Sequence, residues 1–213
     1  MQPQVEFLLA RPGLDPDLRV IVCAQAAACC GDWPRFERVL AAARDRGCCR
    51  DSVAEGLLQG VLFYGFPRSI TAFEALNSAW PSEHPPQGGT LPEADQPAAG
   101  RALFDAIYGK NAVAVADMLA RGHGELRAFV LDVAYGRILT RPALPPRTRE
   151  IVATAVLAAM QQTPQMVAHG RGALHFGATA NELREALYTC LAPDVASVDA
   201  CVAKITRAVR PER

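Results

Sequence analysis

The sequence predicts an all-α protein made of two similar helical units packed side by side as a pseudo-dimer. Apolar residues recur at helical spacing, as in the stripe formed by Ile151, Val152, Ala155, Val156 and Ala159. Helix-start signals recur along the chain, and the chain aligns with itself at an offset of 130 residues. No segment shows a pattern that argues for strands.

The internal repeat decides the expected domain organisation. Residues 14–76 align with residues 144–206 without a gap, with 11 identities over 63 positions. The identities include residues that begin and end helices, namely Pro16/Pro146, Pro34/Pro164 and Gly47/Gly177. We expect a first copy at 1–80, a linker rich in Pro, Gly and acidic residues at 81–100, and a second copy at 101–213.

Each copy should contain the same helices in the same order. In the second copy, Pro146 suits a first helical turn, and Thr163 is predicted to cap a helix that has Pro164 at its first position. Gly177 should end that helix, and Thr179 with Glu182 forms a capping box for the next one. The first copy repeats this plan at Asp15-Pro16, Asp32-Trp33-Pro34 and Gly47, and two further helices, over 101–122 and 125–139, are expected before the second copy.

Composition excludes several classes of function. The 22 basic and 22 acidic side chains give no net charge and no basic stripe, which argues against a nucleic-acid partner. The longest apolar run, over 20–30, is shorter than the roughly 18 to 20 residues that a membrane span needs. The first residues do not read as a signal peptide, so we expect a cytoplasmic protein with no membrane partner.

Seven cysteines are present without a C-x-x-C or zinc-type spacing. They fit reduced core thiols of a cytosolic protein. A redox role for the vicinal pairs Cys29/Cys30 or Cys48/Cys49 is the alternative. Neither a metal nor a cofactor is expected.

The two copies differ where reactive groups would be expected. Glu150, His169 and Arg171 stand in the second copy where the offset places Val20, Val39 and Ala41 in the first. This difference indicates that only the second copy carries a site. Alternatively, His169 is a satisfied core histidine and Glu150 a carboxylate favoured by a helix N-terminus.

Helix geometry alone leaves the pairing of these groups open. In a straight antiparallel hairpin that turns near Gln162, Glu150 and His169 would miss each other by about 9 Å along the axis. A crossing angle, a bridging water or a neighbouring subunit would have to close that gap. Gly170 and Gly172 interrupt the same helix, and since each interior glycine costs roughly 1 kcal/mol, they indicate close approach by a neighbouring helix or a ligand.

The chain resembles the carboxymuconolactone decarboxylase family, which is related to the AhpD-type alkylhydroperoxidases. The resemblance rests on "RPGLDPDLR" at 11–19, "YGFP" at 64–67, "AYGRILTRPALPPRTREIVATAVLAAM" at 134–160 and "QMVAHGRGALHFGATANELREAL" at 165–187. It covers both copies and implies an AhpD-like helical fold. It also implies homo-oligomers, and for a fused pair of copies plausibly a trimer.

AhpD-type members reduce peroxides with a C-x-x-C that is served by a histidine and a glutamate. Glu150 and His169 match that pair, but Gln162 and Gln165 stand at the cysteine positions. Because glutamine has no thiolate, peroxiredoxin-like activity at this site is not expected.

The decarboxylase branch lacks those cysteines and shares the pattern at 168–174. This resemblance implies a lyase that removes CO2 from a small carboxylated lactone formed in aromatic-compound catabolism. His169 would be the general acid with Glu150 beside it as the second catalytic residue, and Arg171 and Arg149 would hold a carboxylate of the small-molecule substrate. Arg137 and Arg141 are weaker candidates.

Departures from the family pattern add three candidate binding residues. The family helix usually has Asn where His175 stands, and the "YGFP" of the first copy has become "DVAS" at 194–197. We therefore expect a pocket that combines His169 with Tyr64 and Phe66 across the pseudo-dimer or between subunits, with His175 nearby. Three functions stay open: the lyase, an oxidoreductase that uses an unusual cysteine, and a non-catalytic ligand-binding or assembly module.

Overall fold

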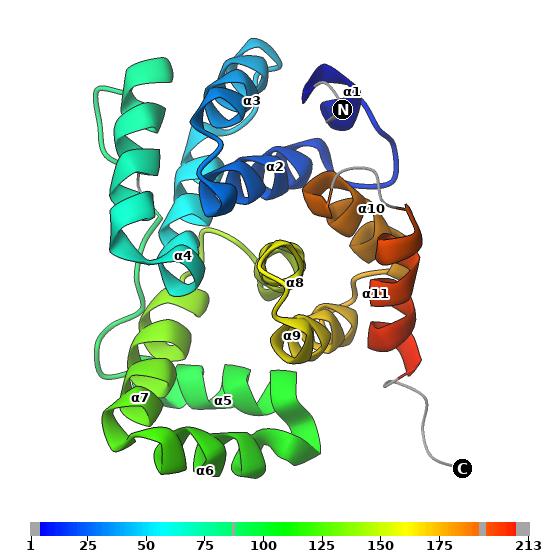
Figure 1. The fold of residues 1–213 in the computed structure, drawn as a ribbon. Helices are drawn as coiled ribbons and strands as arrows, with labels where there is room; N and C mark the ends of the chain where they lie inside the picture. Colours follow the sequence, from blue (N-terminus) through cyan, green and yellow to red (C-terminus); the bar gives the residue numbers. More distant parts are fainter. Residues whose placement is uncertain (1–4, 87, 192–194, 208–213) are drawn as a thin grey trace.

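The computed structural model describes residues 5–86, 88–191 and 195–207, and Figure 1 shows its arrangement. These residues form helices joined by short turns and contain no strand, which confirms the predicted all-α class. The elements are α1 (Val5–Leu9), α2 (Pro16–Cys30), α3 (Trp33–Asp45), α4 (Arg50–Ala79), α5 (Gln96–Tyr108), the short 3₁₀ helix η1 (Gly109–Asn111), α6 (Ala112–Gly122), α7 (Gly124–Ala128), the π-helix η2 (Phe129–Leu139), α8 (Pro146–Ala159), α9 (Thr163–His175), α10 (Ala180–Leu191) and α11 (Val195–Arg207).

The helix bounds repeat in the register of the sequence repeat. α2, α3 and α4 begin at Pro16, Trp33 and Arg50, and α8, α9 and α10 begin 130 residues later in each case. α4 bends at Gly65, whose φ is 73° and ψ 177°, and its second part corresponds to α11. Both sets therefore have the same plan of helices, with the region from α5 to η2 inserted between them.

Most of the predicted helix ends are confirmed. The carboxylates of Asp15 and Asp32 accept hydrogen bonds from the backbone N–H groups of Leu18 and Arg35. Thr179 and Glu182 form the reciprocal bonds of a capping box.

Two of the predicted boundaries are wrong. The N-cap of α9 is Gln162 and not Thr163, which is already the first helical residue. The predicted helix over 101–122 is divided at Gly109, whose φ of 52° and ψ of −130° no helix accommodates.

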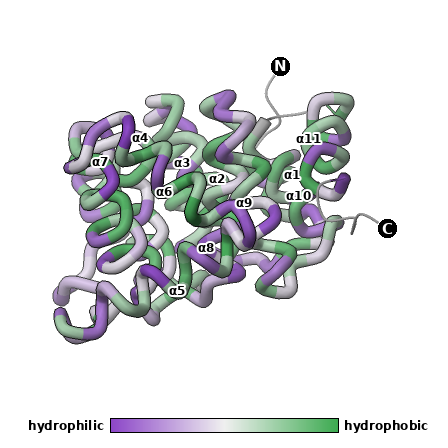
Figure 2. Tube along the Cα trace, turned by 90° about the horizontal axis from the view of Figure 1, so that it is seen from below, coloured by the Kyte–Doolittle hydropathy of each residue, from purple (hydrophilic) through white to green (hydrophobic). Residues whose placement is uncertain are grey.

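α8 passes through the middle of the molecule and packs against α9, α10, α2 and α4. Figure 2 places α2, α8 and α9 centrally, with α7 and α11 at opposite ends. From Ile151 onward this central helix is mainly apolar, and Ile151, Val152, Ala155 and Val156 are completely buried. It belongs to a large core shared by both copies.

A second, smaller core lies in the inserted region. Its buried members come from α5, α6 and η2, and α5 packs against both η2 and α9. Gly100 and Gly136 allow the backbones of α5 and η2 to touch, since a Cβ on Gly100 would come within 2.6 Å of the Cα of Gly136. The insertion therefore packs over α9.

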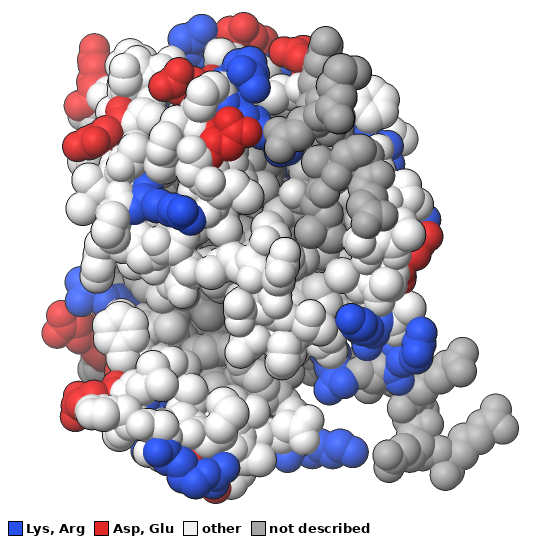
Figure 3. Space-filling model, in the orientation of Figure 1, with Lys and Arg blue, Asp and Glu red and all other residues white. Residues whose placement is uncertain are grey.

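None of the described helices is both long enough and apolar enough to cross a bilayer. In the view of Figure 3, a broad uncharged area occupies the middle of the face, with charged side chains toward its edges.

Candidate functional site

Glu150 and His169 are in direct contact. Nδ1 of the His169 imidazole lies 2.9 Å from Oε2 of Glu150, and the two side chains are 9% and 1% exposed. The pair joins α8 to α9, two helices that pack closely against each other. The separation of about 9 Å that an idealised straight hairpin predicts for Glu150 and His169 therefore does not apply. The two side chains are joined by a direct hydrogen bond.

The two glycines of α9 have separate structural reasons. A Cβ on Gly172 would lie 2.5 Å from Oε2 of Glu150, so glycine leaves room for the carboxylate to reach His169. A Cβ on Gly170 would meet the side chain of Ile205 at 2.6 Å, so this glycine admits α11. One glycine thus serves the carboxylate–imidazole pair and the other serves helix packing.

A cavity of about 570 Å³ lies between α9 and the turn that joins α5 to α6, and neither Glu150 nor His169 is among its lining residues. The residues around it are Ile107, Tyr108, Asn111, Val115, Met118, Thr163, Pro164, Gln165, Val167, Ala168 and Arg171. Ile107 connects the cavity to the pair, because it lies 3.1 Å from the same Cβ position on Gly172 that Glu150 restricts. Its volume is typical of a small-molecule site.

Arg171 lines the cavity without an ion-pair partner among the described residues. Its Nε is buried and has no hydrogen-bond partner there. A buried guanidinium N–H without an acceptor is unfavourable.

Two tyrosines from the insertion lie near the carboxylate and were not predicted from the sequence. Burial raises the pKa of Tyr135 well above its ordinary value, and the negative charge of Glu150 adds to this effect. Burial also raises the pKa of Tyr108, again with a contribution from Glu150. Both phenols therefore stay protonated and can act as hydrogen-bond donors. In the sequence, only the aromatic content of the segment predicted as two connecting helices indicates these tyrosines.

Arg149 was expected to bind substrate, and the structure contradicts this expectation. Its side chain is 1% exposed, and its guanidinium donates to Oε1 of Glu55 at 2.7 Å and to the backbone oxygen of Arg141 at 2.8 Å. Arg141 binds the same carboxylate with two further hydrogen bonds of 2.7 and 3.0 Å. Both arginines are thus occupied between the two halves of the chain, away from the cavity.

The same arrangement occurs a second time with the halves exchanged. Glu185 of the second half accepts hydrogen bonds from Arg19 at 3.0 Å and from Arg11 at 2.7 and 3.0 Å. Each of these residues corresponds to one of the first cluster at the offset of 130 residues. We call the two clusters, Arg141/Arg149/Glu55 and Arg11/Arg19/Glu185, the reciprocal clamps. Such an exchange is what a two-fold interface between equivalent units produces.

The remaining predicted binding residues do not line the cavity. Tyr64 is half-buried, with its hydroxyl next to Gly60 and Gln25 in the first half of the chain. Phe66 is 66% exposed. His175 is exposed at the end of α9, where its ring meets Phe176 edge-on. The expected pocket of His169 with Tyr64 and Phe66 is therefore not formed within one chain, and Asp194 of "DVAS" lies outside the described residues.

In the first copy, the positions equivalent to Glu150 and His169 are filled by core side chains, because Val20 and Val39 are at most 1% exposed. At the positions where a C-x-x-C would stand in the second copy, Gln162 and Gln165 are both exposed. No cysteine lines the cavity beside His169. Within the described ranges, no three His, Cys, Asp or Glu side chains are grouped to hold a metal ion.

The cysteines of the first copy form a different environment. Cys29 is buried and Cys30, the last residue of α2, is exposed. A hydrogen bond from Cys29, together with the nearby charges of Arg35 and Arg68, lowers the pKa of Cys30 to about 6. The lowered pKa favours the thiolate of Cys30, the form in which a cysteine reacts.

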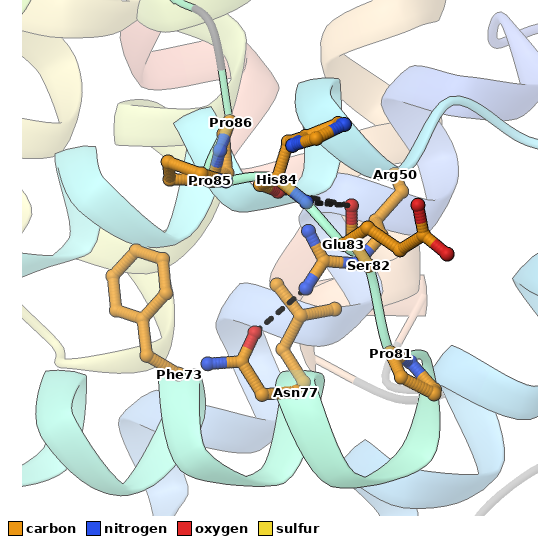
Figure 4. A pocket seen from close by; sticks show the side chains of 10 residues that line it. Arg50, Phe73, Asn77, Pro81, Ser82, Glu83, His84, Pro85 and Pro86 are labelled. Carbon is orange, nitrogen blue, oxygen red and sulfur yellow. Dashed lines mark hydrogen bonds between the residues drawn. The ribbon is translucent and has the colours of Figure 1, made fainter.

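A second cavity, of about 390 Å³, lies between α4 and residues 81–86 (Figure 4). Two nitrogens of its cation are already used, because the guanidinium of Arg50 donates to the backbone oxygen of Trp80 at 2.6 Å and to Oδ1 of Asn77 at 2.7 Å, while its Nη1 is buried without a partner among the described residues. Arg50 thus caps the end of α4 and holds the linker, and His84 is exposed in the loop. We assign this cavity no ligand.

Comparison with known proteins agrees with the predicted resemblance. Residues 124–210 match the carboxymuconolactone decarboxylase family. The chain is 27% identical over 135 residues to Peroxisomal protein 2 of Schizosaccharomyces pombe, an alignment that covers 62% of this chain and 63% of that protein. It is 33% identical over 66 residues to 4-carboxymuconolactone decarboxylase of Acinetobacter baylyi, covering 31% of this chain and 49% of that protein.

The aligned segments therefore span less than two thirds of either relative. Glu150, His169 and Arg171 all fall within the residues that match the carboxymuconolactone decarboxylase family.

Proposed function

We propose that this protein is a lyase that decarboxylates a small carboxylated, lactone-type substrate by acid–base chemistry at Glu150, His169 and Arg171. The observation that carries the proposal is the buried hydrogen bond between Glu150 and His169 on α8 and α9, together with a cavity along α9 that is lined by Arg171, whose Nε has no partner among the described residues. The family of residues 124–210 and the name of the Acinetobacter baylyi relative support the same reaction class.

The geometry divides the chemical work among the three side chains. Nδ1–H of His169 donates to the Glu150 carboxylate, which fixes the tautomer and leaves Nε2 to exchange a proton with the substrate. Glu150 stabilises the imidazolium when His169 is protonated. Arg171 holds the substrate carboxylate. When CO2 leaves, the electron pair of the broken C–C bond passes into a dienolate, and Nε2–H of the protonated His169 gives its proton to a carbon of that dienolate.

The test is release of CO2 from a panel of carboxylated lactones by the wild-type protein and by His169→Ala. General acid–base groups contribute roughly 10²- to 10⁴-fold to rate, so we expect His169→Ala to lower kcat by about 100-fold or more. His84→Ala, which changes an exposed loop histidine, is the matched control and should leave the rate unchanged. Equal rates for wild type and His169→Ala would refute the proposal.

A second candidate is an oxidoreductase that uses Cys30. Its support is the exposed Cys30 thiolate beside Cys29, at a place different from the C-x-x-C position of AhpD-type proteins. Peroxide consumption should then fall to the uncatalysed rate in Cys30→Ser and persist in His169→Ala. A wild-type protein that consumes no peroxide excludes this function.

We further propose that the chain forms homo-oligomers, plausibly trimers. Phe66 and Ile70, one helical turn apart on α4, are 66% and 57% exposed, and on α6 Val113 is 64% exposed. Adjacent exposed apolar side chains such as Phe66 and Ile70 favour contact with another protein surface. Light scattering during gel filtration gives the mass directly, and a monomer at micromolar concentration would contradict the proposal.

The site of action in the cell is also a proposal. The sequence is typical of a cytoplasmic protein, whereas the name of the Schizosaccharomyces pombe relative refers to the peroxisome. We propose the cytoplasm, and fluorescence microscopy of the tagged full chain with a peroxisomal marker distinguishes the two compartments.

A further inference from the structure

We propose that Cys30, the last residue of α2, is a modification site that forms a mixed disulfide with a small, negatively charged thiol compound. The neighbouring guanidiniums of Arg35 and Arg68 select the charge of that compound. The proposal concerns the first copy of the chain and is independent of the lyase proposed for the second. It also differs from the peroxide chemistry considered for Cys30, because it needs no peroxide.

Cys30 is the accessible member of a group of neighbouring thiols. It is exposed at the end of α2, whereas Cys23, Cys29 and Cys190 are 0%, 6% and 8% exposed. The thiol of Cys190 also donates to the backbone oxygen of Ala155 at 3.0 Å. A reagent from solution therefore meets Cys30 first among these four cysteines.

Arg68 brings an exposed cation to the same end of α2. Its guanidinium donates to the backbone oxygen of Cys29, and its Nη2 lies 4.0 Å from the Cβ position of Gly31. These two residues stand on either side of Cys30 in the chain. Arg68 has no ion-pair partner among the described residues, so its charge is available to an anion that approaches the thiol.

Arg35 supplies a second cation, which is buried. It is only 6% exposed on α3, and its Nη2 lies 3.7 Å from Sγ of Cys23 and donates to the backbone oxygen of Thr189 at 3.2 Å. Its Nε is buried without an acceptor in the part of the chain that the structure describes. Such an N–H group is unfavourable unless an anion or another acceptor meets it.

The charges around Cys30 also favour its reactive form. The hydrogen bond from Cys29 lowers the pKa of Cys30 most, and the charges of Arg35 and Arg68 lower it further, to about 6. Burial and the carboxylate of Asp32 act in the opposite direction. A lowered pKa favours the thiolate, which is the nucleophile in disulfide exchange.

The modification is a thiol–disulfide exchange in which the small disulfide is itself the oxidant. The Cys30 thiolate attacks one sulfur of that disulfide and forms a new S–S bond. The original S–S bond breaks, and its electron pair leaves on the second sulfur as a thiolate. Each exchange therefore yields one modified chain and one small thiol.

Cys29 is badly placed to release the adduct again. Release would join Cys29 to Cys30, and the Cα atoms of adjacent residues are about 3.8 Å apart across a trans peptide. Disulfides usually join Cα atoms that lie roughly 4.4 to 6.8 Å apart. A bond between these neighbours would distort the end of α2, so we expect the mixed disulfide to persist.

Intact-mass spectrometry with two small disulfides of opposite charge tests the selection. Glutathione disulfide is negatively charged and cystamine is positively charged, and each rate is divided by the rate of the same disulfide with free N-acetylcysteine. We expect one adduct per chain, located at Cys30 by peptide mapping. It should form at least about tenfold faster with glutathione disulfide on this normalised scale.

Single substitutions at exposed positions separate the roles of the thiol and the cation. Cys30→Ser should abolish the adduct, whereas Cys49→Ser, in the other vicinal pair, should retain it. Arg68→Gln should lower the preference for glutathione disulfide over cystamine by about tenfold. Arg46→Gln, an exposed arginine whose charge acts on Cys48, is the matched control and should keep that preference.

Three results would overturn the proposal. They are an adduct that forms on another cysteine instead of Cys30, equal normalised rates with the two disulfides, and a preference that survives in Arg68→Gln. Neither assay measures decarboxylation, so failure of the lyase would leave these results unchanged.

Discussion

Replacing Arg149 by methionine distinguishes a structural arginine from a substrate-binding one. The structure assigns Arg149 to a reciprocal clamp, where it donates to the Glu55 carboxylate, to Oε1 of Gln59 at 3.3 Å and to the backbone oxygen of Leu144 at 3.2 Å. Methionine fills a similar volume without a charge. The substitution should therefore destabilise the fold and leave ligand binding at Arg171 unchanged.

The magnitude follows from what remains after the change. Removing one member of a buried ion pair costs about 3 to 5 kcal/mol. Glu55 would keep its two hydrogen bonds to Arg141, so we expect the lower end, about 3 kcal/mol. For a chain of this size that loss lowers Tm by roughly 6 to 12 °C.

Urea unfolding followed by circular dichroism measures this loss, and differential scanning calorimetry measures the Tm. Arg19→Met should show a similar loss, because Arg19 makes the equivalent bonds to Glu185, Thr189 and the backbone oxygen of Pro12. Arg184→Met is the control: its pair with Asp199 is nearly half exposed on both sides and contributes about 0 to 1 kcal/mol. An Arg149→Met protein with unchanged Tm and lost carboxylate binding would refute the assignment.

Three further predictions concern other parts of the chain. Gly172→Ala should lower turnover at least tenfold with little loss of stability, because the methyl group would displace the Glu150 carboxylate from His169. Crystallography or histidine NMR would show the displaced pair. Gln161→Gly should stabilise the protein by about 1 kcal/mol in urea unfolding, since Gln161 has a φ of 59°; an unchanged or lower stability would show that this backbone is not strained. Burial by itself raises the pKa values of Glu55 and Glu185, but their arginine partners outweigh this effect and lower both pKa values. The clamps therefore contribute stability above the ordinary glutamate pKa of 4.5 and lose it as the pH falls through the lowered values. Glu55→Gln should shift the acid-unfolding midpoint upward, and an unaltered midpoint would contradict the clamp.

Local signals in the sequence determined the helices. Asp15-Pro16, Asp32 and the box of Thr179 with Glu182 place helix starts because capping depends only on neighbouring backbone groups. The helix break at Gly109 was not predicted, because the apolar spacing continues through this residue and only its backbone angles show the break. The sequence repeat also predicted the register of the equivalent helices in the two copies, and the observed helix bounds follow that register.

The sequence also identified which residues deserved attention in the second copy. Glu150, His169 and Arg171 stand out because their counterparts Val20, Val39 and Ala41 cannot do the same chemistry. It could not decide whether Glu150 and His169 touch, because a side-chain contact depends on how two helices cross and on the space that Gly172 leaves.

Only the tertiary structure separated the two arginines. Arg149 and Arg171 look alike as candidate carboxylate ligands, yet Arg149 meets a glutamate 94 positions away and Arg171 meets none among the described residues. Tyr108 and Tyr135 became part of the site in the same way, by the folding of an inserted segment over the second copy. The sequence by itself therefore determined the helices and the reactive residue types, because these depend on near neighbours. The pairing of charges was decided by contacts between distant segments, which no local pattern encodes.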